Sequence, residues 1–303
     1  MTWTSVRKIT RRGEPKVWAL TGSGLIENHP YEAWSILAAL WPPDLPTSEV
    51  FDAAWVVWEP TYQLSNGAWV PAMAVDIVAV KRDAFAALVD RHVVRRTAQQ
   101  AGLDLPEMIT TEVWVPLTSG ERKKLKMAEA IPGQYGYFLR NEATRNGTAA
   151  GGSPLADPAV RQILGKFGQD KVVVYAENLP VLKDVTNLLD AAGIGWVKVE
   201  GKMSARSREM AITRHRTEPN VRVFLGTKMI ERGLNLQHAR VLMTLSPSDN
   251  PASEEQRARR IRRIGSPCSV AHHVVFLADS DHERARVARL AGKEAMRMSL
   301  GAA

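Results

Sequence analysis

Cysteine is nearly absent from this sequence, and so are the residue patterns that hold a metal ion. Cys268 is the one cysteine among 303 residues, so the chain cannot form an internal disulfide or a metal site built on cysteine pairs. His272 and His273 are adjacent, and in a strand they would face opposite sides, which excludes them as joint ligands of one metal. We therefore expect no metal site made by this chain alone.

Long apolar runs and export signals are also missing. No apolar stretch approaches the roughly 20 residues that a membrane-spanning helix requires. The N-terminal residues MTWTSVRKITRRGEP are basic, but no apolar segment of the kind found in secretory signals follows them. Together with the single cysteine, these absences lead us to expect a cytoplasmic protein with no membrane partner.

A third absence concerns phosphate binding. A P-loop requires the pattern Gly-x-x-x-x-Gly-Lys-Ser/Thr, whose amides and lysine hold phosphates. The Gly-Lys pairs at 165–166, 201–202 and 292–293 continue with Phe, Met and Glu, so none of them fits this pattern. No Asp-Glu-x-His or Asp-Glu-x-Asp sequence is present either. The chain therefore has no P-loop and no acidic box for magnesium.

The composition is that of a soluble globular protein with an excess of positive charge. Hydrophobic residues make up 45% and charged residues 24%, which excludes a disordered chain. The length is sufficient for two lobes, each with its own core. The formal net charge of +8 favours a polyanionic partner such as nucleic acid.

The second half of the sequence alternates regularly between strands and helices. Each strand is apolar on both faces, which is typical of a parallel sheet covered by helices on both sides. We therefore predict an α/β fold for residues 159–303. The expected strands are 171–176, 196–201, 221–227, 240–245 and 271–278, and the expected helices are 180–193, 204–216 with Ser204 as N-cap, and one from about 281.

The first 140 residues are less regular, and their strands do not complete a sheet. Strands are expected at 16–23 and 112–117, and helices at 29–41 and 83–100. Thr118 and Glu121 have the spacing of a capping box for a further helix. Residues 141–158, NEATRNGTAAGGSPLADP, lack apolar periodicity and favour a flexible linker between the two regions.

Five arginines lie within seven positions in the segment SEEQRARRIRRIGSP at 253–267. On a continuous helix Gln256, Arg260 and Arg263 would share one face, while Ala258, Ile261 and Ile264 would point elsewhere and pack on a core. Arginine suits phosphate because its rigid fork donates two parallel hydrogen bonds and keeps its proton. A solvated basic helix is the alternative interpretation.

The surrounding motifs resemble a known family. The segment TKMIERGLNLQHARVLMTLSPSDNPASEEQRARRIRRIG (227–265) resembles the C-terminal lobe of Swi/Snf-type superfamily 2 helicases and translocases. Thr227 with GLNL at 233–236 matches motif V, Asn250-Pro251 matches the pair upstream of motif VI, and Gln256, Arg260 and Arg263 match motif VI. KVVVYAEN resembles motif IV, and GKMSARSR at 201–208 resembles the segment that follows it. More loosely, WALTGSGLIENHPYEAWSILAAL at 18–40 resembles motif III, and VVRRTAQQAGLDLP at 93–106 the segment that leaves the first lobe.

This resemblance implies a RecA-like parallel sheet in the C-terminal lobe, preceded by an incomplete remnant of a first RecA-like lobe within residues 1–140. In the family, ATP lies between the two lobes, and motifs I and II, absent here, precede motif III. We therefore expect the C-terminal part of a split ATP-dependent DNA helicase or translocase. A separate N-terminal lobe would carry motifs I and II and the Mg²⁺ ligands. A degenerate paralogue or a mis-set start codon would leave the same sequence.

The resemblance also implies roles for individual residues. Arg263 and Arg260 would act as arginine fingers on ATP, and Gln256 would orient them by hydrogen bonding. Gly233 would allow close backbone approach, and Asn235 would reach the ribose or join motif V to motif VI. The expected contacts with double-stranded DNA, or another nucleic acid, are Thr227, Lys228, Lys202 and Ser204.

Two other classes of function remain open at this point. The chain would also fit a nucleic-acid-binding or regulatory module that no longer hydrolyses ATP, or a structural adaptor. For Lys202 and Lys228 the alternative is an ordinary exposed lysine, and for Thr227 an ordinary turn residue.

Overall fold

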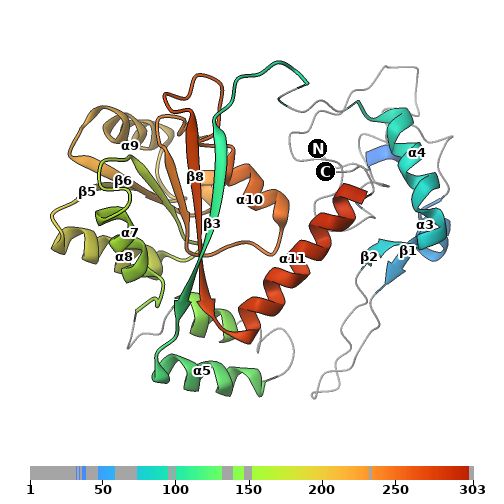
Figure 1. Ribbon diagram of the computed structural model, residues 1–303, viewed down its shortest axis with the longest axis horizontal. Coiled ribbons are helices and arrows are strands. Elements are labelled where there is room, and N and C mark those ends of the chain that lie inside the picture. Colours follow the sequence, from blue (N-terminus) through green and yellow to red (C-terminus); the bar gives the residue numbers. More distant parts are fainter. Residues whose placement is uncertain are drawn as a thin grey trace. The chain divides into compact units, whose positions relative to one another are not determined.

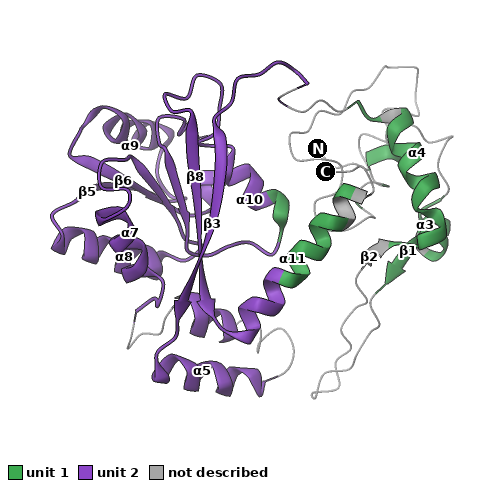
Figure 2. Cartoon of the chain, viewed as in Figure 1, with its two compact units in different colours: residues 1–96, 250–252, 288–303 green, residues 97–249, 253–287 purple. Residues whose placement is uncertain are grey.

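The computed structural model describes residues 32, 34, 36–38, 47–58, 74–94, 98, 100–131, 139–146, 152–231 and 234–299. The chain forms two compact units (Figure 2). Residues 1–96, 250–252 and 288–303 make up the first unit, and residues 97–249 and 253–287 the second.

The second unit is built on a six-stranded sheet in which every pairing is parallel (Figure 1). The strand order is β3-β8-β7-β4-β6-β5. The strands are β3 (Glu107–Pro116), β4 (Val172–Tyr175), β5 (Gly195–Val199), β6 (Val221–Gly226), β7 (Val241–Thr244) and β8 (Val270–Asp279). The parallel sheet predicted from the strand pattern is thereby confirmed.

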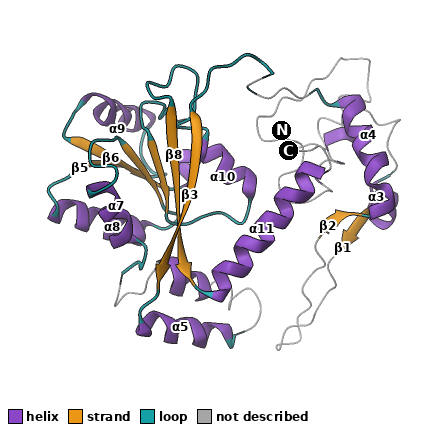
Figure 3. Ribbon diagram, viewed as in Figure 1, coloured by secondary structure: helices purple, strands orange, loops and turns teal. Residues whose placement is uncertain are grey.

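Helices connect these strands or follow the last of them (Figure 3). They are α5 (Ser119–Glu129), the π-helical turn η3 (Glu142–Asn146), α7 (Ala156–Leu164), α8 (Leu179–Ala191), α9 (Ala205–Thr217), η4 (Lys228–Glu231), α10 (Pro251–Ala258) and α11 (Asp281–Ser299). Two predicted helix starts are confirmed. Thr118 and Glu121 form the capping box of α5, and Ser204 caps α9 by accepting a hydrogen bond from the amide of Ser207 at 3.1 Å.

Alternate residues of the central strand β4 enter two separate cores, one on each face of the sheet. Val172 and Val174 pack with residues of α7 and α8, such as Ile163 and Leu182. Val173 and Tyr175 pack with residues of α9 and of the loops around α10. Because successive side chains of a strand point to opposite faces, each strand of this kind must be apolar throughout.

The strand expected at 112–117 belongs to this sheet and not to the first region of the chain. β3 is longer than expected and pairs with β8 along its whole length, from Glu107 opposite Val270 to Pro116 opposite Asp279. The prediction that residues 1–140 form one region was therefore wrong in this respect. Local sequence shows that a segment is a strand, but the partner is chosen by tertiary packing.

The stretch expected as a flexible linker also differs from the expectation. Within it, Thr144 and Arg145 are buried in η3, and Leu155 is buried at the start of α7. The hydroxyl of Ser153 donates to the carbonyl of Arg145 at 2.6 Å. Residues 147–151 lie outside the described part. The described parts of 141–158 thus pack as part of the second unit.

The described part of the first unit is small. It contains α3 (Ser48–Trp55), the antiparallel pair β1 (Val56–Trp58) and β2 (Ala74–Ile77), η2 (Ala79–Lys81) and α4 (Arg82–His92). Trp34, Leu37, Phe51, Phe85 and Val89 are among the residues of its core. The strand expected at 16–23 lies outside the described residues. No helix among those described is long and apolar enough to cross a membrane.

Candidate functional site

The arginine-rich segment is a short helix followed by tight turns. α10 ends at Ala258, after which the amide of Arg260 bonds to the carbonyl of Arg257 at 2.9 Å and that of Ile261 to Ala258 at 3.3 Å. These bonds span three residues and tighten the chain. Ile261 is fully buried in the core on this face of the sheet. The prediction of one continuous helix face was therefore wrong, because Arg260 and Arg263 lie in the turns after the helix.

Contacts with identified partners hold three of the arginines, Arg257, Arg259 and Arg262. Arg257 is buried, with its guanidinium carbon 3.7 Å from the centroid of the Tyr175 ring and its Nη2 donating to the Tyr175 hydroxyl at 3.0 Å. Arg259 pairs with Glu255, and Arg262 donates from Nε to the carbonyl of Pro106 at 2.7 Å. The presence of these three arginines is therefore accounted for by contacts within the protein, and no ligand is needed to explain it.

Arg260 and Arg263 lie in the turns that follow α10. Both side chains are half-buried, and burial together with the nearby charge of Arg263 lowers the pKa of Arg260. Arg263 has no side-chain hydrogen bond or ion pair with any residue that the structure describes. Two positive charges held close together have an unfavourable mutual energy, which an anion between them would remove. This pair is therefore suited to a phosphate.

Sequence motif V is joined directly to the turns that carry these arginines. The amide of Leu236 donates to the carbonyl of Arg260 at 3.3 Å, and the hydroxyl of Ser266 donates to the carbonyl of Gln237 at 3.0 Å. Gly265 has φ +77°, a conformation that residues other than glycine rarely adopt. Motifs V and VI are thus joined by one main-chain hydrogen bond and by one hydrogen bond from the Ser266 side chain to a main-chain carbonyl.

Two of the other residues expected to contact ATP, Asn235 and Gln256, belong to the described part of the chain. Asn235 accepts a hydrogen bond at its side-chain oxygen from the amide of Gln237 at 3.3 Å, so this side chain bonds to its own loop. Gln256 is half-buried near the end of α10. Gly233 lies outside the described residues.

A hollow of about 340 Å³ lies between α9 and the motif V loop. Arg208 and Arg216 come from one face of α9, and Asn235 from the loop. Sequence reasoning matched Arg208 to a family motif but missed Arg216. The eight-residue spacing of the two arginines was a signal, since it places them on the same side of a helix. The remaining lining residues are Ala205, Glu209, Ile212 and Leu234.

The residues expected to contact DNA follow the carboxyl ends of two neighbouring strands. Thr227 and Lys228 follow β6, while Lys202 and Ser204 follow β5. Ligands of open α/β sheets bind at this edge. Lys228 and Lys202 are exposed, and the ammonium of Lys228 lies 2.8 Å from a carboxylate oxygen of Glu177. The Ser204 hydroxyl also caps α9, where it accepts from the amide of Ser207.

The two adjacent histidines lie on opposite faces of β8, as predicted. His273 is within hydrogen-bond distance of the Thr244 hydroxyl, at 3.0 Å, and the ring of His272 lies 5.4 Å from that of Phe167. Among the described residues there is no group of three His, Cys, Asp or Glu side chains that would hold a metal ion.

Comparison with known proteins finds sequences that are similar to part of this chain. Residues 157–265 match the model of the helicase conserved C-terminal domain. An uncharacterized ATP-dependent helicase of Schizosaccharomyces pombe is 30% identical over 148 residues, which are 46% of this chain and 14% of the relative. The human DNA excision repair protein ERCC-6 is 27% identical over 172 residues, 55% of this chain and 11% of the relative. The chain thus matches a small part of the length of these relatives.

The fold has a counterpart among solved structures. The C-terminal part of the Fun30 ATPase domain superposes with a TM-score of 0.52 at 12% identity, over 65% of this chain and 98% of that structure. Residues 157–265 therefore resemble the helicase conserved C-terminal domain, and the superposed part of the chain has the fold of the C-terminal part of the Fun30 ATPase domain.

Proposed function

We propose that this lobe completes the nucleotide site of an ATP-dependent DNA helicase or translocase. The P-loop of that site would come from a lobe outside these 303 residues. The observation that carries the proposal is the pair Arg260 and Arg263, whose like charges are held together in the turns after α10 of a helicase C-terminal domain. ATP is the ligand whose charge these residues fit.

The proposed chemistry is electrostatic. During phosphoryl transfer, negative charge spreads over the transferring oxygens, and guanidinium groups placed there stabilise the transition state. Arg263 and Arg260 would supply this charge. Gln256, on the last turn of α10, would orient them. The P-loop lobe would hold Mg²⁺, which neutralises charge on the phosphates.

We further propose that the lobe binds the DNA backbone at the carboxyl ends of β5 and β6. Lys202 and Lys228 would contact phosphates, and the hydroxyls of Thr227 and Ser204 would add hydrogen bonds. The exposure of both lysines supports this surface. The contact between Lys228 and Glu177 would exchange for a phosphate, because exposed ion pairs contribute little free energy.

The decisive experiment is DNA-stimulated ATP hydrolysis by this chain mixed with a P-loop lobe. We expect no hydrolysis by the chain alone and hydrolysis by the mixture. In the mixture Arg263→Ala lowers kcat by about 10³-fold while DNA affinity is retained, since arginine fingers elsewhere contribute at least this much.

Arg259→Ala is the matched control, because Arg259 lies in the same segment but pairs with Glu255. Its kcat stays close to that of the unchanged protein. Unchanged hydrolysis in Arg263→Ala would refute the finger assignment. DNA binding without hydrolysis in any mixture would instead support the ATPase-inactive module.

A further inference from the structure

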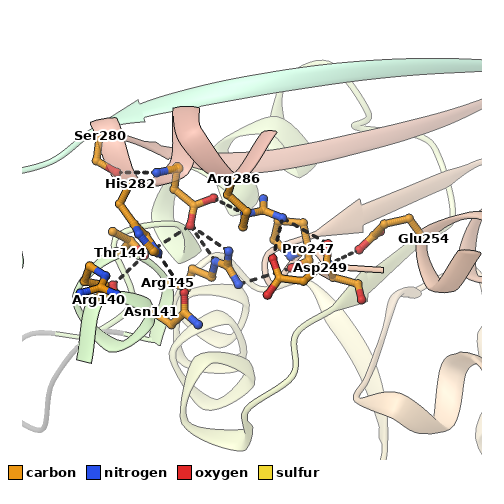
Figure 4. A network of polar contacts seen from close by, with 12 residues as sticks. Arg140, Asn141, Thr144, Arg145, Pro247, Asp249, Glu254, Ser280, His282 and Arg286 are labelled. Atoms are coloured by element: carbon orange, nitrogen blue, oxygen red, sulfur yellow. Dashed lines mark hydrogen bonds and ion pairs between the residues drawn. The ribbon is translucent and has the colours of Figure 1, made fainter. Parts of the chain in front are cut away.

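A group of buried charges lies beside the first turns of α11 (Figure 4). Glu283 is fully buried, and Arg145 and Arg286 are 6% and 1% exposed. The carboxylate of Glu283 accepts from Nε of Arg145 and from Nε of Arg286, each at 2.9 Å. Buried charges are costly unless they are paired and hydrogen-bonded, and here one carboxylate serves two guanidinium groups.

Both arginines also donate hydrogen bonds to the loop between β7 and α10. Nη1 of Arg145 donates to the carbonyl of Pro247 at 3.4 Å, and Nη1 of Arg286 to the carbonyl of Ser248 at 3.2 Å. Arg286 also lies 3.9 Å from a carboxylate oxygen of Asp249. Figure 4 shows these side chains directed at this loop from η3 and from α11. The network therefore holds the main chain of two consecutive loop residues.

The same loop is joined to α10 from its other side. The amide of Ser248 donates to the carboxylate of Glu254, which also pairs with Arg257. The carbonyl of Arg257 in turn accepts from the amide of Arg260 at 2.9 Å. A continuous series of polar contacts thus runs from Glu283, through Ser248 and Glu254, to the turn that carries Arg260.

We propose that Arg145, Glu283 and Arg286 are positioning residues. They would fix the β7–α10 loop and through it the orientation of Arg260 and Arg263. The proposal rests on the function proposed above for those two arginines. Burying three charges is a poor way to stabilise a fold, since apolar side chains of similar volume often serve as well. The rigid guanidinium fork, however, sets direction as well as distance, and a displacement of about 1 Å at a catalytic group can cost about 10²-fold in rate.

The test is Arg286→Lys in the mixture that hydrolyses ATP. Lysine retains the charge for Glu283 but lacks the fork that also reaches the Ser248 carbonyl. We expect kcat to fall by about 10- to 100-fold, with the KM for ATP changed by less than about threefold. Far-UV circular dichroism and thermal melting verify that the variant is folded at the assay temperature. Arg145→Lys is the second variant, with the same expected pattern, and replaces the first if that one does not fold.

Arg284→Lys is the matched control on the same helix. Arg284 is exposed, pairs with Asp279 and lies over the Trp114 ring, 4.8 Å from its centroid. Its kinetics stay those of the unchanged protein. A kcat in folded Arg286→Lys equal to that of this control would overturn the proposal.

A combined variant separates positioning from general loosening. In the background that carries both Arg260→Ala and Arg263→Ala, Arg286→Lys causes no further fall in kcat, because it acts only through the two arginines that it positions. A further fall by the full factor would show an independent structural effect and overturn the proposal. If Arg263→Ala alone leaves hydrolysis intact, the finger assignment fails instead, so the two failures are distinguished.

Discussion

At the residue scale, His215 shows how burial determines a protonation state. Its Nε2 lies 3.1 Å from the carbonyl of Arg222 and its Nδ1 lies 2.9 Å from Nε2 of His238. A carbonyl can only accept, so the proton of neutral His215 resides on Nε2. Burial, followed by the charge of His238, lowers the pKa of His215 to about 3.

We predict that His215 makes the protein sensitive to acid. The unfolded chain binds a proton at His215 below about pH 6.5, whereas the folded protein does so only near pH 3. The contribution of His215 to the free energy of unfolding is therefore complete above pH 6.5 and decreases as the pH is lowered towards 3. Between pH 7 and 5 this one residue accounts for a loss of about 2 kcal/mol in the free energy of unfolding.

Urea denaturation at pH 7 and pH 5 measures this effect. In His215→Gln the free energy of unfolding changes between the two pH values by about 2 kcal/mol less than in the unchanged protein. An equal difference in both proteins would contradict the assignment of this sensitivity to His215.

At the element scale, the turn from β6 into η4 depends on one glycine. A Cβ at Gly226 would lie 2.8 Å from Cγ1 of Ile230, which is itself fully buried. The turn places Thr227 and Lys228 at the edge of the sheet, so close packing of η4 on β6 fixes part of the candidate nucleic-acid surface.

Gly226→Ala is expected to lower the free energy of unfolding by about 1–3 kcal/mol, because a side chain forced into a filled core displaces its neighbours. Urea or thermal denaturation measures the loss. Gly120→Ala is the control, since a Cβ at Gly120 in α5 meets no atom within 4 Å. A loss of the same size in the control would argue against steric conflict with Ile230.

At the scale of the whole molecule, charge and sheet order together predict how nucleic acid would bind. The net charge of +8 favours phosphate contacts of any sequence, and such binding weakens as salt rises. The proposed contacts lie at the β5 and β6 side of the sheet, whereas β3 forms the opposite edge.

Lys202→Ala is therefore expected to weaken binding to double-stranded DNA uniformly across sequences. The slope of log Kobs against log salt concentration becomes shallower by about 1, the value for one phosphate contact. Lys126 lies on α5, which follows β3. Lys126→Ala is therefore the control, and it leaves the affinity for DNA and the slope unchanged. Fluorescence anisotropy at several salt concentrations provides the measurement. Equal slopes in the two variants would exclude Lys202 from the interface.

The candidate site contains some residues that sequence motifs predict and others that only the fold brings together. Matching by motif predicted Arg260, Arg263 and motif V as parts of the candidate site, because these motifs follow one another along the chain. It missed the buried group around Glu283, since nothing in a local pattern distinguishes a buried arginine from a solvated one. Arg145 was assigned to a linker for this reason. Only the fold brings it to Glu283, 138 positions away along the chain.

The sequence by itself determined the order of the strands β4 to β8, the helices α8, α9 and α11 between and after them, and the caps at Thr118 and Ser204. These properties depend on neighbours within a few residues, which share a helix face or a strand face. The tertiary structure alone decided that β3 pairs with β8, that α10 ends at Ala258, and that two buried arginines share one carboxylate. Each of these results depends on which distant segments pack together, since strand pairing and the burial of charge are settled by free energy over the whole fold.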